Sequence, residues 1–338
     1  MYVSRRRIGA LLFVLFAPLV TRAEVVFIDS VFDYTTATDI VYGTGTIGVG
    51  SPEGPHQKDL LLDLYLPDQN VIQGALPTVI LIPGGGFSIC DKESIGFLAA
   101  NFASRGYAAI AMEHRVYPEL LASESHLLTS GFSPEAVFQG QPLGDLKTLG
   151  YAAAIQDALK AISWVDSNAS TYNLDSDRLL IGGGSAGARV ALAVGLVEAP
   201  TEIAGVLSLL STIPNNEHLV GSTAPPFILF NGVNDDLVPI SAAFGLADVA
   251  QALNIPFSLY LGNQGHDASQ FFIPSQEEEL SEYEASIRFF YENLNLSSIP
   301  IISPVPEASS LVLGGVVAAV AWFGVVRRNL RSLRSAGG

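Results

Sequence analysis

The sequence contains very little sulfur and no residue cluster with the pattern of a metal site. Cys90 is the only cysteine among 338 residues, so an intramolecular disulfide is excluded. No group of histidine, cysteine and carboxylate residues has metal-ligand spacing, and no phosphate-binding glycine loop or dinucleotide fingerprint is present. We therefore expect neither a metal nor an organic cofactor. Cys90 is interpreted as a small buried apolar residue, with a thiol function as the alternative.

Basic residues are also scarce, and nearly half of them lie at the two ends of the chain. The chain has 17 lysine and arginine residues against 33 aspartate and glutamate residues. Residues 24–296 hold only 9 of the basic residues but 32 of the acidic ones. Such an acidic surface repels nucleic acid and anionic membranes, so we expect no nucleic-acid partner. Adaptation to salty surroundings and a generic solubilising surface would both produce this composition.

The N-terminal end has the pattern of an export signal. Three arginines precede the apolar stretch Ile8 to Val20, and Thr21-Arg22-Ala23 follows it. A positive segment, an apolar segment and a small-residue cleavage site, in that order, are typical of a signal peptide. We assign the signal peptide to residues 1–23. An uncleaved anchor is the alternative, although the apolar stretch is short for one.

A serine in a glycine-rich turn is the strongest chemical signal in the chain. The apolar run Leu179 to Ile181 ends in glycines, and a stretch rich in alanine, valine and leucine follows the motif Gly183-x-Ser185-x-Gly187. The pattern predicts a strand that turns sharply into a helix, with the serine at the turn. A nucleophilic serine needs this geometry, because its hydroxyl must project from the turn while small neighbours let other elements approach. Ser185 is therefore the candidate nucleophile.

An acid and a histidine follow downstream, in the order Ser, acid, His that such a turn requires. Asp235 follows the predicted strand that begins at Pro226, and His266 follows the predicted strand Phe257 to Leu261. Loops after the ends of parallel strands meet at one edge of a sheet. We expect His266 to accept the serine proton and Asp235 to orient the imidazole. Asp236 is the rival for the acid.

A second glycine run is placed to stabilise a developing negative charge. The predicted strand Thr78 to Ile82 leads into Pro83-Gly84-Gly85-Gly86-Phe87, about 100 residues before the serine turn. Glycines allow backbone N–H groups to converge without interference from side chains. Losing one such donor typically costs about 2.7–4 kcal/mol of transition-state stabilisation. A flexible glycine turn of no chemical meaning is the alternative for this segment alone.

Together these motifs resemble the α/β-hydrolases, in particular the small carboxylesterases that carry an H-G-G-G oxyanion loop. Further similar segments are Asp59 to Pro67, Ser104 to Ala108 and Glu113 to Pro118. The resemblance implies oxyanion donors at the backbone N–H groups of Gly85, Gly86 and Ala186. One position departs from the family pattern: Pro83 stands where the family has the histidine that supports the loop.

The resemblance implies one α/β-hydrolase domain over residues 24–296, with a mostly parallel sheet and helices on both faces. The short interval 210–226 leaves no room for a large cap, whereas the irregular stretch 119–149 is a candidate lid or binding loop. The activity implied is hydrolysis of short-chain or carbohydrate-linked carboxylic esters. A peptidase or lactone hydrolase on the same scaffold is one alternative, and an inactive surface-displayed binding or matrix protein is another.

The C-terminal end resembles the PEP-CTERM sorting signal of Gram-negative bacteria. Val305-Pro306-Glu307-Ala308 precedes the apolar run Leu311 to Val326, which Arg327-Arg328 closes. We assign residues 297–338 to a spacer and this tail. The resemblance implies an exported enzyme, periplasmic, cell-surface or extracellular, and a sorting or processing protease as partner. An ordinary membrane anchor is the alternative, with the basic end in the cytoplasm in both cases.

The tail hypothesis predicts that the mature protein ends upstream of Val326. The apolar run is shorter than the ~20 residues of a full bilayer span, which favours a segment that is recognised and then removed. Intact-mass analysis of protein from the producing cells checks this. If residues 327–338 remain attached and the enzyme fractionates with the inner membrane, the tail is an anchor instead.

Overall fold

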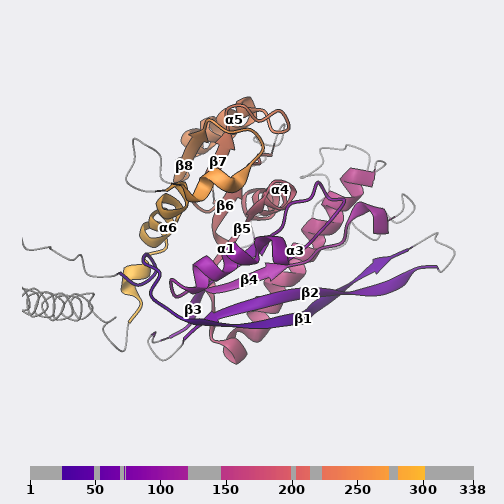
Figure 1. Ribbon diagram of the computed structural model, residues 1–338, viewed down its shortest axis with the longest axis horizontal. Coiled ribbons are helices and arrows are strands. Elements are labelled where there is room, and N and C mark those ends of the chain that lie inside the picture. The colour runs from indigo at the N-terminus through magenta and orange to yellow at the C-terminus, as the bar shows by residue number, and fades with distance from the viewer. Residues whose placement is uncertain are drawn as a thin grey trace, which may run out of the picture. The chain divides into compact units, whose positions relative to one another are not determined.

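The computed structural model describes several stretches of the chain between residues 25 and 300 (Figure 1). The described residues are 25–48, 54–68, 72, 74–120, 146–198, 203–213, 223–273 and 281–300. The predicted signal peptide and the tail after residue 300 lie outside these residues. So do most of the predicted loop 119–149 and residues 214–222, which belong to the short interval before Asp235. Within the described part of the chain, no helix is long and apolar enough to cross a bilayer.

The described strands form one eight-stranded sheet in the order β1-β2-β4-β3-β5-β6-β7-β8. β2 is antiparallel to both of its neighbours, β1 and β4, and every other neighbouring pair is parallel. The strands are β1 (Tyr34–Ile47), β2 (His56–Pro67), β3 (Leu76–Ile82), β4 (Ala108–Met112), β5 (Leu174–Gly184), β6 (Ile203–Leu209), β7 (Phe227–Gly232) and β8 (Phe257–Gly262). The mostly parallel sheet predicted from the sequence is confirmed.

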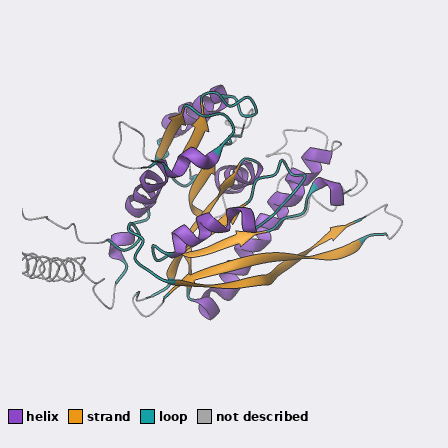
Figure 2. Cartoon of the chain, viewed as in Figure 1, coloured by secondary structure: helices purple, strands orange, loops and turns teal. Residues whose placement is uncertain are grey.

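Helices flank this sheet, as the purple and orange elements of Figure 2 show. The α-helices are α1 (Glu93–Ala103), α3 (Leu146–Tyr172), α4 (Ala186–Leu192), α5 (Ile240–Leu253) and α6 (Glu282–Asn293). The shorter helical segments are η1 (Tyr117–Glu119), η3 (Ala193–Glu198), η5 (Ala268–Phe272) and η6 (Leu296–Ser298).

The helices cover both faces of the sheet. Gly205 on β6 lies against Leu180 and against Phe290 of α6, whereas Gly195, just after α4, lies against Ile181. Successive residues of a strand point to opposite faces. Because Leu180 and Ile181 are adjacent in β5, α6 and the segment after α4 lie on opposite faces. This agrees with the predicted arrangement.

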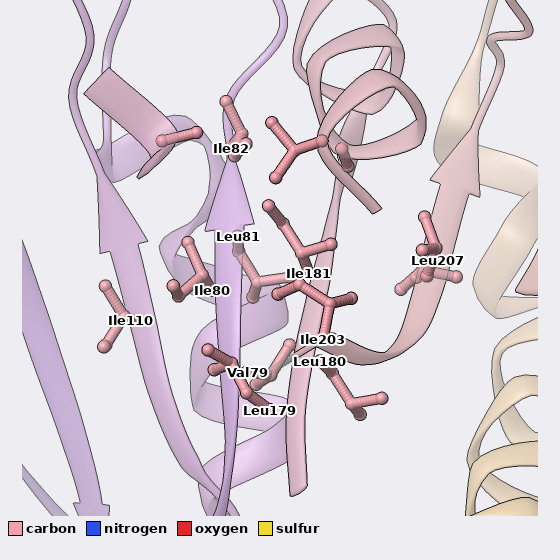
Figure 3. Close-up of a cluster of buried hydrophobic side chains, with 14 of the residues drawn as sticks. Val79, Ile80, Leu81, Ile82, Ile110, Leu179, Leu180, Ile181, Ile203 and Leu207 are labelled. Carbon is pink, nitrogen blue, oxygen red and sulfur yellow. The ribbon is translucent and has the colours of Figure 1, made fainter. Parts of the chain in front are cut away.

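The core lies around the central strands β3, β4, β5 and β6 (Figure 3). The side chains of Val79, Ile80, Leu81 and Ile82 in β3 are all fully buried. A strand that is covered on both faces needs a continuous run of apolar residues, whereas a strand with one solvent-exposed face has alternating apolar and polar residues. Each side chain of this size contributes about 1.5–3 kcal/mol when removed from water. The ends of β3 and β5, where the candidate site lies, are therefore attached to a rigid core.

Two element boundaries differ from the sequence-based expectation. α3 begins at Leu146, inside the stretch 119–149 that was expected to be irregular. β5 begins at Leu174 instead of Leu179, because a register shift accommodates a turn in which the Asp175 carboxylate accepts the N–H groups of Asp177 and Arg178. Both differences lengthen an element beyond its predicted extent.

A buried ion pair fastens β1 and α3 to the segment after β4. Asp157 on α3 is fully buried and accepts hydrogen bonds from the Arg115 guanidinium and backbone N–H at 2.8–3.2 Å. Lys160 adds a second cation 3.0 Å from the same carboxylate and donates to the Thr44 carbonyl of β1. Burial by itself raises the pKa of Asp157, but the two cations outweigh it and hold that pKa below the usual value.

Removing this carboxylate should destabilise the domain strongly. Asp157→Ala leaves Arg115 buried without its anion, a change that costs about 3–5 kcal/mol in comparable buried pairs. Because the folded-state pKa of Asp157 is lowered, its contribution is present above the unfolded pKa of about 4 and is lost as pH falls through the folded value. Urea unfolding at neutral and acidic pH measures this, with the exposed Asp166→Ala on the same helix as control. Equal stability of the two variants would contradict the account.

Candidate active site

Ser185 lies at a strained turn between β5 and α4. Its backbone has φ 50° and ψ −115°, a conformation that costs a non-glycine residue of the order of 1–3 kcal/mol. The surrounding structure holds it there: the Ser185 N–H donates to the carbonyl of Leu209 at 2.8 Å, and its own carbonyl accepts the N–H of Arg189 at 3.0 Å. The predicted change from strand to helix at this serine is therefore present.

The two glycines of the motif are required by a close approach of backbone. A Cβ on Gly183 would overlap the carbonyl oxygen of Ile82, and a Cβ on Gly187 would overlap the carbonyl oxygens of both Ile82 and Pro83. The end of β3 thus lies directly against the serine turn. This contact places the glycine loop that follows β3 beside the candidate nucleophile.

The structure brings the three predicted residues Ser185, Asp235 and His266 into one hydrogen-bonded chain. His266 Nε2 lies 2.7 Å from Ser185 Oγ, and His266 Nδ1 lies 2.7 Å from Asp235 Oδ2. The three residues follow β5, β7 and β8, whose carboxyl ends lie at the same edge of the sheet. This geometry suits proton transfer from a hydroxyl to an imidazole that a carboxylate orients.

Asp235, and not Asp236, contacts the histidine. The Asp235 side chain is fully buried, and its Oδ1 accepts the N–H groups of Leu237 at 2.8 Å and Val238 at 2.9 Å. Burial raises the pKa of Asp235, but the hydrogen bonds from His266 and the two amides lower it below its ordinary value overall. Asp235 therefore stays ionised at neutral pH, whereas Asp236 is exposed to solvent.

The loop after β3 has a backbone conformation that its glycines make possible. Gly85 and Gly86 have φ values of 127° and 60°, a region that favours glycine. The carbonyl of Gly85 accepts the N–H and hydroxyl of Ser88, at 3.0 and 2.8 Å, which closes a tight turn. Among the described residues, the backbone hydrogen bonds of the turns and loops include none donated by the N–H groups of Gly85, Gly86 or Ala186. A Cβ on Gly84 would lie 3.4 Å from that of Ser185, so loop and serine are neighbours.

Of the other histidines, His56 and His114 lie within the described residues, and neither they nor Cys90 take part in this arrangement. His126 and His218 lie outside the described residues, and His56 is exposed. His114 is buried, which lowers its pKa, and its Nδ1 lies 2.8 Å from the carbonyl of Arg115. Cys90 Sγ accepts the N–H of His114, and burial raises the pKa of this thiol to about 12. Cys90 is only half-buried and lies outside the core cluster, so the predicted burial is reached in part.

Sequence reasoning missed the groups that hold the site residues in place. These groups are backbone atoms: the N–H groups of Leu237 and Val238 donate to Asp235, and the Leu209 carbonyl accepts the N–H of Ser185. Backbone contacts of this kind cannot be inferred from residue types. The sequence motifs also indicated no role for Phe87, the residue directly after the glycines. Within the described residues, no group of three or more histidine, cysteine or carboxylate side chains could hold a metal ion.

Comparison with known sequences places this chain near ester hydrolases. Residues 146–219 match the family model described as BD-FAE, which includes the serine turn but neither Asp235 nor His266. Endo-1,4-beta-xylanase B of Butyrivibrio fibrisolvens is 24% identical over 239 residues, which are 60% of this chain and 33% of that protein. Esterase LipQ of Mycobacterium tuberculosis is 24% identical over 244 residues, covering 58% and 51% of the two chains. The chain thus spans between one third and about half of the length of these relatives.

Comparison with solved structures shows the fold. Esterase 2 of Thermogutta terrifontis with bound propionate superimposes with a TM-score of 0.54 at 16% identity, covering 79% of this chain and 95% of that one. MGS-M1, an alpha/beta hydrolase enzyme from a Medee basin deep-sea metagenome library, gives a TM-score of 0.50 at 20% identity, with coverages of 75% and 98%. The chain therefore has the α/β-hydrolase fold, as predicted.

The geometry predicts that the two neighbouring aspartates are not equivalent. Asp235→Asn should cut kcat for ester hydrolysis by several orders of magnitude, since the same change in a serine protease costs about 10⁴-fold. Asp236→Asn, the matched control, should have little effect because its side chain is exposed. Steady-state kinetics of both variants on one ester measure the difference, and the reverse ranking would assign the acid to position 236.

Proposed function

We propose that this protein is a serine hydrolase that cleaves carboxylic esters through Ser185, Asp235 and His266. The observation that carries the proposal is the continuous hydrogen-bonded chain from Asp235 Oδ2 through the His266 ring to Ser185 Oγ, with both distances 2.7 Å. The hydroxyl at one end of this chain lies beside a glycine loop, and none of the described residues accepts a backbone hydrogen bond from the N–H groups of Gly85 or Gly86. Acyl transfer to a serine needs both parts.

In the proposed mechanism, Ser185 Oγ attacks the ester carbonyl carbon while His266 Nε2 accepts the hydroxyl proton. Asp235 accepts a hydrogen bond from Nδ1–H throughout, which fixes the tautomer and stabilises the imidazolium as it forms. The carbonyl oxygen becomes negatively charged and accepts hydrogen bonds from the backbone N–H groups of Gly85, Gly86 and Ala186.

Collapse of this tetrahedral intermediate breaks the bond to the alcohol, which leaves with the proton from His266. A water molecule then loses a proton to His266 and attacks the acyl-enzyme. When the second intermediate collapses, the bond to Ser185 Oγ breaks, His266 returns its proton to that oxygen and the carboxylic acid leaves, so the enzyme returns to its starting state.

The substrates that fit best are short-chain or carbohydrate-linked esters. Two comparisons support this choice. The Thermogutta esterase holds propionate, which suits the short-chain esters, and the Butyrivibrio relative is named a xylanase, which suits the carbohydrate-linked esters. Around the site, Ile89 after the glycine loop and Leu237 beside the acid are 67% and 73% exposed and offer apolar surface to an acyl or alcohol group. A peptidase or lactone hydrolase would use the same residues.

We further propose that the enzyme works outside the cytoplasm. The proposal rests on the signal-peptide pattern of residues 1–23 and on the PEP-CTERM-like tail at residues 297–338. The acidic composition of the domain suits an exported, soluble catalytic part that does not bind anionic surfaces.

Replacing the serine tests the proposed chemistry. Ser185→Ala should abolish nearly all hydrolysis of p-nitrophenyl acetate. The residual rate should be that supplied by the oxyanion hole and substrate binding, which in known triads is roughly 10³–10⁴-fold above the rate in water. Ser94→Ala removes an exposed serine hydroxyl of the same chain and serves as control. Wild-type activity in the folded Ser185→Ala protein would refute the mechanism.

A substrate panel separates the ester hydrolase from its alternatives. We expect the highest kcat/KM for p-nitrophenyl esters of short acyl chains, because the interval 210–226 leaves no room for a large lipase-type lid. Aminoacyl anilides and lactones in the same panel test the peptidase and lactone-hydrolase alternatives. Faster turnover of either, or interfacial activation on long-chain triglyceride emulsions, would contradict the assignment; no turnover of any compound would favour the inactive binding protein.

A further inference from the structure

Phe87, the residue directly after the three glycines, is an aromatic anchor for this loop. Its backbone has φ 62°, which is unusual for a bulky residue, yet its side chain is buried. The Phe87 ring lies 5.2 Å from the ring of Tyr151 on α3, at 35° between planes, and 6.4 Å from the ring of His114. The side chain thus points from the loop into the body of the domain.

The surroundings of Phe87 are shaped to receive it. A Cβ on Gly150, one residue before Tyr151, would lie 3.0 Å from the Cβ of Phe87, so α3 carries a glycine where the loop crosses it. The Phe87 carbonyl accepts the N–H of Tyr117 at 2.8 Å. Both the side chain and the backbone of Phe87 are therefore fixed by contacts outside the glycine loop.

Tyr151 continues this contact to the helix that begins at the nucleophile. The Arg189 guanidinium lies over the Tyr151 ring, 4.8 Å from its centroid, and the Tyr151 hydroxyl donates to the Arg189 carbonyl at 3.3 Å. A cation over an aromatic face is attracted by the ring quadrupole. The N–H of Arg189 in turn donates to the Ser185 carbonyl. The loop and the serine turn are thus connected through α3 as well as through their direct contact.

We propose that Phe87, Tyr151 and Arg189 form a positioning stack that sets the N–H groups of Gly85 and Gly86 against Ser185. The proposal rests on the function proposed above. The stack supplies the loop support that the esterase resemblance assigns to a histidine, at the position where this chain has Pro83. None of the three side chains has to touch the substrate for this role.

The chemistry gives the expected size of the effect. An oxyanion hole works only if its donors are already placed where the charge develops, and removing one donor costs about 10²–10³-fold in kcat. A shift of the loop without loss of the donors should cost less. We therefore expect a fall in kcat of roughly 10–100-fold when the stack is broken, with KM nearly unchanged, because the donors act mainly on the transition state.

Four variants of the full-length protein test the stack. Phe87→Ala and Tyr151→Ala remove a ring from the stack. Phe87→Leu also removes the ring but keeps most of the side-chain volume, so it serves if Phe87→Ala does not fold. Tyr151→Phe retains the ring and should keep nearly all activity. The control is Tyr172→Ala, which removes a ring stacked on Trp164, 5.6 Å away between centroids, on the same helix α3.

Two readouts separate positioning from a general loss of stability. The inhibition constant of a trifluoromethyl ketone, which forms a tetrahedral oxyanion on the serine, should rise in parallel with the loss of kcat/KM. Amide hydrogen exchange of the peptide covering residues 83–90 should become faster in Phe87→Leu and Tyr151→Ala than in Tyr172→Ala. The second readout needs no catalysis.

The outcomes are distinct. Unchanged exchange of residues 83–90 in every folded stack variant would overturn the proposal whatever the activity, as would equal kcat losses in Tyr172→Ala and Tyr151→Ala. If the wild-type protein hydrolyses no ester, the proposed function fails, and the exchange measurement still decides whether the stack holds the loop. Faster loop exchange with unchanged kcat and ketone affinity would show that the stack has no catalytic role.

Discussion

The close backbone contact between the end of β3 and the serine turn is the constraint on which the rest of the site depends. The carbonyl oxygens of Ile82 and Pro83 occupy the space that side chains at positions 183 and 187 would need. Only glycine satisfies this contact, and the contact in turn fixes where the loop after β3 can lie. The strained conformation of Ser185 is tolerated because the surrounding strands, including the fully buried β3, hold the turn in place.

The electrostatics of the site follow from burial and from a few backbone donors. A buried carboxylate would normally resist ionisation, yet Asp235 is held as an anion by the histidine and two amides. The buried Asp157 is likewise kept ionised, by Arg115 and Lys160. In both cases, the cost of burial is offset by contacts of fixed geometry. One anion orients a catalytic group in the proposed mechanism, and the other fastens the edge of the sheet to α3.

The sequence predicted the mostly parallel sheet, and it singled out the three residues that the structure joins by hydrogen bonds. The fold was predictable because few folds place a glycine-flanked serine between an apolar strand and a helix. The three residues could be grouped because the carboxyl ends of parallel strands meet at one edge of the sheet. The sequence favoured Asp235 but kept Asp236 as a rival, since neighbouring carboxylates differ only in burial and contacts, which the sequence does not show. It also gave no sign that α3 begins at Leu146 or that Phe87 contacts Tyr151. Contacts between residues far apart in the chain have no local pattern.

The central claim is that Ser185 is a nucleophile activated by His266 and Asp235. Covalent labelling of the intact protein with paraoxon, followed by mass spectrometry of its peptides, tests that claim most directly. The account predicts a single diethylphosphoryl group on the peptide that contains Ser185, slow or absent labelling in His266→Ala, and loss of esterase activity in proportion to labelling. Stoichiometric labelling of another residue with Ser185 unmodified would contradict it.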